Sequence, residues 1–304
     1  MECAYWDAGV CRSCTWLEVP YPEQVATKQE AVERALAEVP GGPGTEWLPP
    51  RTSAETGFRT RAKMVVGGTV ARPTLGILDG TRHGVDLSDC PVMDPVLRAA
   101  MPRIARFVSE TRLVPYDVPA RRGELKYVLV TCGDEGALMV RFVLRSRRQL
   151  ESLRRSLGRL TELLPDVCVV TANIHPVHEA IVEGPEEIVL TPQATLPMRV
   201  GDVTLAPGPR SFSQTNTGVA GDLYRQAARW VDEGGAGSLW DLYCGVGGFA
   251  LHAALAGVPR VTGVEVSDQA VLSAQRAAAA LGAYLAAHDA LPATRAFVVD
   301  QGHD

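Results

Sequence analysis

The chain has 304 residues and a formal net charge of −5 at pH 7. It contains no apolar run of about 18 residues, which a transmembrane helix needs, and its N-terminus, MECAYWDAG, lacks the basic and apolar segments of a signal peptide. These features exclude a membrane-embedded protein and predict a cytoplasmic location, where the seven cysteines are reduced or metal-bound.

The first residues carry three cysteines at a spacing typical of metal sites. Cys3, Cys11 and Cys14 follow the pattern C-x7-C-x2-C, and thiols gathered in this way in a cytoplasmic chain indicate a metal site. Cys90, in the sequence VDLSDCPV, is the best candidate for a fourth ligand, and His83 is a rival candidate. Four thiolates hold either zinc or a [4Fe–4S] cluster, and the spacing alone does not distinguish these two possibilities.

Residues 22–39 predict a helix, which ends at the flexible sequence PGGPG. Residues 51–160 then contain 20 basic and 11 acidic residues, so that an acidic protein has a basic middle segment. This asymmetry favours a polyanionic partner, and an arginine-rich solvated surface is the alternative. Arg59, Arg61 and Lys63 alternate along a predicted strand, which puts them on one face, toward either phosphates or solvent.

The middle segment predicts an α+β domain with an antiparallel sheet. Helices are expected at residues 94–112 and 147–164, the second with an arginine-rich exposed face; strands are expected at residues 125–132, 137–144, 167–174 and 187–191. Cys132 and Cys168 lie within apolar strands, and we interpret both as core residues. A Pro- and Gly-rich stretch at residues 201–210 leads into the last part of the chain.

That last part contains a strand, a glycine turn and a helix start in direct succession. Leu239 to Tyr243 is a short apolar run, Gly245, Gly247 and Gly248 follow it, and a helical pattern begins at residue 249. Such a turn lets backbone N–H groups approach an anionic or nucleotide-like ligand closely. The alternative is a glycine turn between buried elements that binds nothing.

Two polar residues complete the predicted ligand site. A second strand, in VTGVEVSD, ends in Glu265, where a carboxylate can accept hydrogen bonds from ribose hydroxyl groups. Gln214 lies on the loop before a helix that Asn216 or Thr217 can cap, where its amide could reach a ligand in the turn. The turn lacks G-x-G-x-x-G spacing, and its sequence DLYCGVGGF resembles the first motif of Rossmann-like S-adenosylmethionine (SAM) methyltransferases.

Three features occur together: the N-terminal cysteines with a later Asp-Cys-Pro, the stretch SFSQTN, and DLYCGVGGF. This combination resembles the iron–sulfur-containing RNA 5-methyluridine methyltransferases, and among these it is most similar to members that act on 23S ribosomal RNA. The resemblance implies that SAM is bound by Gln214, Tyr243 and Glu265, with Gly245 in the turn. It also implies that a [4Fe–4S] cluster, with zinc as the alternative, is held by Cys3, Cys11, Cys14 and Cys90.

The resemblance implies a mechanism in which a cysteine thiolate adds to carbon 6 of a flipped-out uracil, so that carbon 5 can attack the methyl group of SAM. The family's segments that carry this cysteine and a glutamate base are not matched in the chain. Cys244 lies in the glycine turn, under the cofactor, and is a poor candidate for the nucleophile. No catalytic residue is therefore assigned, and from about Ala283 the chain cannot be matched to the family.

The predicted fold class is α+β, with an N-terminal iron–sulfur cluster segment and a truncated C-terminal α/β Rossmann-like SAM-methyltransferase domain. The domains are residues 1–50 for the cysteine segment and its helix, 51–205 for a basic RNA-binding domain, and 206–304 for the SAM domain, where 296–299 is a third strand. We expect a truncated, inactive uracil-C5 methyltransferase of 23S ribosomal RNA, monomeric and without DNA or membrane partners. The alternatives are methylation of transfer RNA or another RNA, and a non-catalytic RNA-binding remnant.

Overall fold

The computed structural model of the chain describes residues 1–179, 181–287 and 298–300. Its largest element is a seven-stranded sheet with the strand order β3-β2-β1-β4-β5-β6-β7. All neighbouring strands are antiparallel except β5 and β6, which run parallel. The strands are β1 (Arg61–Gly68), β2 (Pro73–Leu78), β3 (Gly84–Asp86), β4 (Leu125–Cys132), β5 (Leu138–Leu144), β6 (Val167–Ile174) and β7 (Glu186–Val189).

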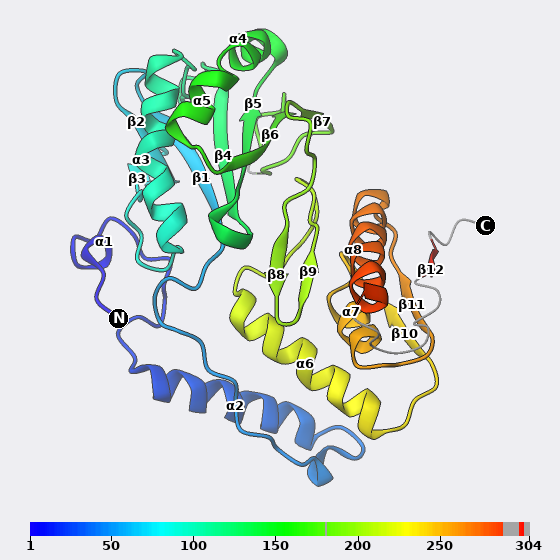
Figure 1. The fold of residues 1–304 in the computed structure, drawn as a ribbon. Helices are drawn as coiled ribbons and strands as arrows, with labels where there is room; N and C mark the ends of the chain where they lie inside the picture. Colours follow the sequence, from blue (N-terminus) through cyan, green and yellow to red (C-terminus); the bar gives the residue numbers. More distant parts are fainter. Residues whose placement is uncertain (180, 288–297, 301–304) are drawn as a thin grey trace.

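Three helices cover one face of this sheet (Figure 1): α3 (Pro95–Glu110), α4 (Leu150–Arg155) and α5 (Leu157–Leu163). The main core lies between them and the sheet, with Phe107 and Phe142 stacked at a centroid distance of 5.6 Å. The carboxylate of Asp94 caps α3 by accepting a hydrogen bond from the Val96 N–H. The prediction of one continuous helix at residues 147–164 is wrong, because the short helix η3 (Arg147–Gln149), α4 and α5 replace it, with a break at Ser156.

The first 50 residues form α1 (Ala4–Asp7), α2 (Tyr21–Ala37) and the short helix η1 (Gly42–Gly44). None of these residues is buried. The predicted strand face of Arg59, Arg61 and Lys63 is only partly observed, because Arg59 precedes β1. Arg61 instead turns into the protein, where its Nε donates to Thr131 Oγ1 and its Nη1 donates to the Ser211 carbonyl.

Beyond the sheet, the hairpin of β8 (Met198–Val200) and β9 (Val203–Leu205) packs against both the large sheet and the C-terminal elements. A second, parallel sheet has the order β10-β11-β12. Its elements, with the helices around it, are α6 (Thr217–Glu233), β10 (Leu239–Leu242), α7 (Gly248–Leu255), β11 (Val261–Val264), α8 (Asp268–Ala287) and β12 (Val298–Asp300). None of the described helices is long and apolar enough to cross a membrane.

Candidate cofactor and cluster sites

The glycine turn follows β10 and leads into α7, as the sequence predicts. Tyr243, Gly245 and Gly247 have φ angles of 63°, 56° and 88°, so the chain runs through the left-handed region to make this tight turn. For tyrosine this conformation costs about 1–2 kcal/mol, which glycine does not incur. The side chain of Tyr243 is 89% exposed as a result and projects from the end of the strand.

Glu265 lies directly beside this turn. Because β10 and β11 are parallel, their carboxyl ends meet at one edge of the sheet, and the residue after β11 comes next to the residues after β10. The Gly245 N–H donates to Glu265 Oε2 at 3.0 Å, and the Ser267 N–H donates to Glu265 Oε1 at 2.9 Å. A carboxylate has about four acceptor positions, so Glu265 retains capacity for two ribose hydroxyl groups.

Gln214 is exposed on the loop before α6, and no described contact joins its side chain to Tyr243, Gly245 or Glu265. The loop itself is anchored on both sides. The Thr60 N–H donates to the Thr215 carbonyl at 2.8 Å, and the Arg210 N–H donates to Gln269 Oε1 at 2.9 Å, next to the corner that carries Glu265. The structure thus anchors the Gln214 segment near the corner that carries Glu265 without fixing the amide.

Two further side chains support the turn, and the sequence did not predict a role for either of them. The ring of Tyr224 on α6 packs edge-on against Phe249 at a centroid distance of 4.6 Å and lies over Gly248. Asp241 Oδ2 accepts a hydrogen bond from the Ala250 N–H at 3.0 Å, and burial raises the pKa of Asp241. The sequence feature that could have pointed to Tyr224 is Gly248, because a glycine at the start of a helix can mark a place where another side chain lies very close.

Cys244 is unsuited to nucleophilic attack. It is buried in the turn, and burial, reinforced by Asp241 and Glu265, raises the pKa of its thiol to about 12. A thiol with this pKa is protonated at neutral pH, and only the thiolate is a good nucleophile. Cys132 is buried as predicted, with its pKa raised to about 11 by burial, whereas Cys168 is half-buried against the second apolar cluster.

The four cysteines of the predicted metal site converge, although 76 residues separate the last two in sequence. Burial raises the pKa of the Cys14 thiol, and the neighbouring thiols of Cys90, Cys11 and Cys3 raise it further. Burial likewise raises the pKa of Cys90, with Cys3 and Cys11 adding to the effect. Tyr5 joins the two segments, because its hydroxyl oxygen accepts a hydrogen bond from the Asp89 N–H at 3.1 Å.

These thiols are not arranged as a ligand set: in the described part of the chain, no group of three or more His, Cys, Asp or Glu side chains could hold a metal ion. The residue types nevertheless suit a soft metal centre, since cysteine sulfur is the ligand that such metals prefer. All seven cysteines are free of disulfide bonds. The metal site therefore stays a prediction.

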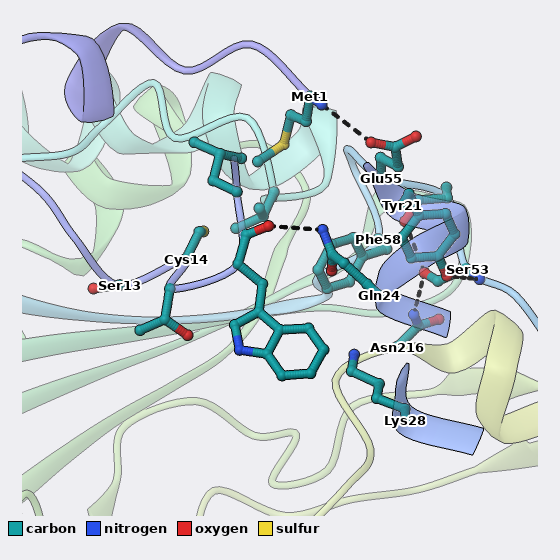
Figure 2. Close-up of a pocket in the computed structure, with 15 residues that line it drawn as sticks. Met1, Ser13, Cys14, Tyr21, Gln24, Lys28, Ser53, Glu55, Phe58 and Asn216 are labelled. Atoms are coloured by element: carbon teal, nitrogen blue, oxygen red, sulfur yellow. Dashed lines mark hydrogen bonds and ion pairs between the residues drawn. The ribbon is translucent and has the colours of Figure 1, made fainter. Parts of the chain in front are cut away.

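A cavity of about 560 Å³ adjoins Cys14 and connects the cysteine segment to the start of α6 (Figure 2). The Ser53 N–H donates to the Tyr21 hydroxyl at 2.7 Å, and Asn216 Nδ2 donates to Ser53 Oγ at 2.6 Å. Asn216 also caps α6, since its Oδ1 accepts from the Val219 N–H at 3.1 Å. This chain of hydrogen bonds links α2 to the loop that carries Gln214.

No family model matches the chain. Among curated proteins, it is 46% identical over 283 residues to the 23S rRNA (uracil(747)-C(5))-methyltransferase RlmC of Halothiobacillus neapolitanus, which covers 93% of this chain and 74% of that protein. It is also 46% identical over 296 residues to the RlmC of Yersinia pseudotuberculosis, which covers 97% of this chain and 78% of that protein.

Among solved structures, the fold matches a tRNA (uracil-54, C5)-methyltransferase of Pyrococcus abyssi in complex with S-adenosyl-L-homocysteine. The TM-score is 0.70 at 23% sequence identity, over 88% of this chain and 62% of that one. The predicted α+β fold with a SAM-methyltransferase part is therefore confirmed at the level of the fold.

Proposed function

The chain belongs to the 23S rRNA uracil-C5 methyltransferases, and we therefore propose that it takes part in the SAM-dependent methylation of carbon 5 of a uracil in 23S ribosomal RNA. The observation that carries this proposal is the 46% identity to such enzymes over 93–97% of the chain. The family consists of RNA uracil-C5 methyltransferases, so the protein is an enzyme of that class. A cytoplasmic, monomeric protein without DNA partners remains our expectation.

We assign SAM binding to Gln214, Tyr243, Gly245 and Glu265. The turn allows a close backbone approach, and the Glu265 carboxylate, held by two backbone N–H groups, retains acceptor positions for ribose hydroxyl groups. When bound, SAM supplies the methyl group. The exposed Tyr243 then lies at the end of β10 where the reacting end of the cofactor is expected.

We further propose that Cys3, Cys11, Cys14 and Cys90 hold a [4Fe–4S] cluster, supported by the gathering of their four thiols. The cluster would join the N-terminal segment to the loop of Cys90. Protein purified without oxygen should absorb broadly in the visible range, whereas a colourless protein with bound zinc would refute the cluster.

The covalent step needs a thiolate across the uracil from SAM, and residues 245–304 contain no cysteine. The chain spans 74–78% of the length of its curated relatives. We therefore assign no nucleophile among these 304 residues.

Equilibrium dialysis with labelled SAM, followed by incubation with undermodified 23S ribosomal RNA, tests both parts. We expect SAM binding that Glu265→Gln weakens about tenfold, because one charge-assisted hydrogen bond to the ribose is lost. Glu233→Gln, an equivalent change on an exposed residue at the end of α6, should leave binding unchanged.

Equal binding by the Glu265 and Glu233 variants would contradict the cofactor site. Label appearing in the RNA would support methyl transfer, whereas its absence would contradict methyl transfer and leave the cofactor site standing.

A further inference from the structure

A second candidate ligand site lies on the large sheet, on the face that α3, α4 and α5 leave uncovered (Figure 1). It is a cavity of about 670 Å³, within the size range of small-ligand pockets. Side chains from β1, β2 and β4 form its floor, and the turn around Arg82 and the loop after β6 form its walls. Its polar and aromatic lining residues include Lys63, Arg82, Tyr116, Lys126, Tyr127 and His178.

A β-bulge gives this pocket two adjacent side chains of one strand. In a regular strand, successive side chains point to opposite faces. The pairing of β4 with β5 shifts register between Leu125 and Tyr127, so one extra residue, Lys126, is inserted there. Lys126 and Tyr127 therefore both line the pocket, while Leu125 and Val128 stay in the core on the other face.

Lys126 is an unusual residue for this position because it is only 5% exposed. Its Nζ donates to the Val177 carbonyl and lies 3.2 Å from His175 Nδ1 and 5.0 Å from the centroid of the Tyr116 ring. His175 Nε2 lies 2.7 Å from the Ile181 carbonyl, which accepts its proton, so Nδ1 is free to accept from the lysine. In the described residues no carboxylate pairs with this buried cation.

Positive charge predominates around the pocket, where three cations and one carboxylate, Glu179, are among the lining residues. Arg121, Lys126 and Arg82 all lie close enough to His178 to lower its pKa, to which burial contributes most. None of the lining cations Lys63, Arg82 and Lys126 takes part in an ion pair within the described residues. By contrast, Arg106, Arg147, Arg154 and Arg159, on or beside the helices of the other face, are all paired with glutamates.

The pocket is also lined by aromatic side chains. The Tyr116 hydroxyl and His178 Nδ1 are hydrogen-bonded at 2.9 Å, and the centroids of the two rings lie 6.0 Å apart. Tyr127 is half-buried with its ring lining the cavity. Aromatic surfaces next to several cations are the combination by which proteins bind unpaired nucleotides, through base stacking and phosphate contacts.

We propose that this pocket binds a single-stranded segment of the RNA substrate, with a base against Tyr127 and the adjoining phosphates on Lys63, Arg82 and Lys126. The inference rests on the proposed function, because it assumes an RNA substrate. It adds a nucleotide-binding site built on the large sheet, composed of residues other than those of the glycine turn and the cysteine cluster. Such a site would fix the position of the RNA on the protein by binding a nucleotide other than the target uracil.

Fluorescence anisotropy with a labelled ten-nucleotide oligouridylate, at several salt concentrations, tests the site in the whole chain. We expect Lys63→Gln/Arg82→Gln to weaken binding about tenfold and to reduce the slope of log K against log salt by about 1.4, since each phosphate contact on single-stranded RNA contributes about 0.7. Tyr127→Leu should weaken binding about tenfold with an unchanged slope, because stacking releases no counterions.

The matched control is Arg148→Gln/Arg155→Gln, which removes two exposed charges without ion pairs from η3 and α4. It should leave affinity and slope nearly unchanged, and thermal melting should verify that all variants fold. A 4-thiouridine in the oligonucleotide should crosslink to the peptide that contains Tyr127. Equal losses in the pocket and control variants would overturn this inference alone, whereas no RNA binding by the unaltered chain would overturn the proposed function with it.

Discussion

At the scale of single residues, Lys126 shows how the fold changes the chemistry of a side chain. Burial, with a smaller effect from Arg145, lowers the pKa of its ammonium group to about 8. The groups around the ammonium are Tyr116, His175 and the Val177 carbonyl. None of them carries a negative charge at neutral pH, so hydrogen bonds and the aromatic ring, without an ion pair in the described residues, offset the cost of burying the cation.

Because of this environment, we expect the free energy of unfolding to increase with pH over a limited pH range. The folded-state pKa lies below the unfolded value of 10.5, so between about pH 8 and 10.5 the unfolded chain binds more protons than the folded one. The free energy of unfolding should therefore rise with pH there, by about 1–2 kcal/mol after allowance for water at the pocket mouth. Lys126→Met should lack this rise. Urea denaturation at pH 7.5 and 9.5 measures the difference.

The control for this measurement is Lys63→Met, which removes an exposed lysine from the same pocket and should follow the parent profile. Parallel pH profiles for the parent and Lys126→Met would contradict the prediction.

At the scale of elements, the sequence located most of the strands, including the short β7, β10 and β11, and missed β2, β3, β8 and β9. The predicted strands at 125–132 and 167–174 coincide with β4 and β6. β2 and β3 were missed because Gly76 looks like a strand breaker, whereas a Cβ there would lie 2.0 Å from the Val85 carbonyl, so glycine is what permits the pairing. The parallel pairing of β5 with β6 was also missed, since periodicity carries no information on strand direction.

The same limit explains what was predicted of the sites. The glycine turn and the cysteine spacing are local patterns, so the sequence located both. The pocket of Lys126 depends on a bulge and on the neighbours of β4 in the sheet, neither of which a single strand's sequence specifies. The sequence instead predicted a basic surface on residues 147–164, where Arg147, Arg154 and Arg159 form ion pairs with glutamates.

The contact of α6 with α7 through Gly248 gives a prediction at this scale. A Cβ on Gly248 would lie 2.5 Å from Cζ of Tyr224, whose half-buried ring is held between Phe249 and His252 and cannot swing aside. Gly248→Ala should therefore destabilise the protein by about 1–3 kcal/mol, despite the better helix propensity of alanine. Urea unfolding with an unchanged m-value measures this loss.

Gly282→Ala on α8 is the matched control. Among the described residues, no atom outside the backbone of α8 lies within 4 Å of the added Cβ, so the same substitution in a helix should stabilise by up to about 1 kcal/mol. Two variants of equal stability would show that the α6–α7 contact yields to the extra methyl group.

At the scale of the whole molecule, the loop of residues 211–216 joins the parts on which the proposed function depends. Thr60 and Arg61 hold it to β1, and the preceding residue, Arg210, bonds to Gln269 next to the corner of Glu265. At its other end, Asn216 bonds to Ser53, which in turn bonds to α2. The second sheet is less well covered, since Trp240 and Leu242 of β10 are 67% and 59% exposed. The chain therefore combines a well-packed central domain with ends whose order depends on few contacts.

The N-terminal segment is the clearest case, because none of residues 1–50 is buried and the first buried residue is Ala62. A segment without its own core needs another source of stability, and metal binding by cysteines supplies such energy in small domains. Oxidative loss of the proposed cluster should therefore unfold this segment while the core between α3 and the large sheet persists. Limited proteolysis with trypsin should then cut the cluster-free protein first at Arg12, Lys28 or Arg34.

Mass spectrometry of the cleaved fragments measures the effect, and far-ultraviolet circular dichroism should report only a small loss of helix, from α1 and α2. Cys14→Ser should reproduce the sensitivity of the cluster-free protein, whereas Cys168→Ser, at a half-buried cysteine remote from the cluster, should resist trypsin like the parent. If loaded and cluster-free protein were cut at the same rate, the surface contacts of residues 1–50 would suffice to order them. The cysteines would then have no structural role in holding that segment, since its order would come from contacts such as the Tyr5 and Tyr21 hydrogen bonds.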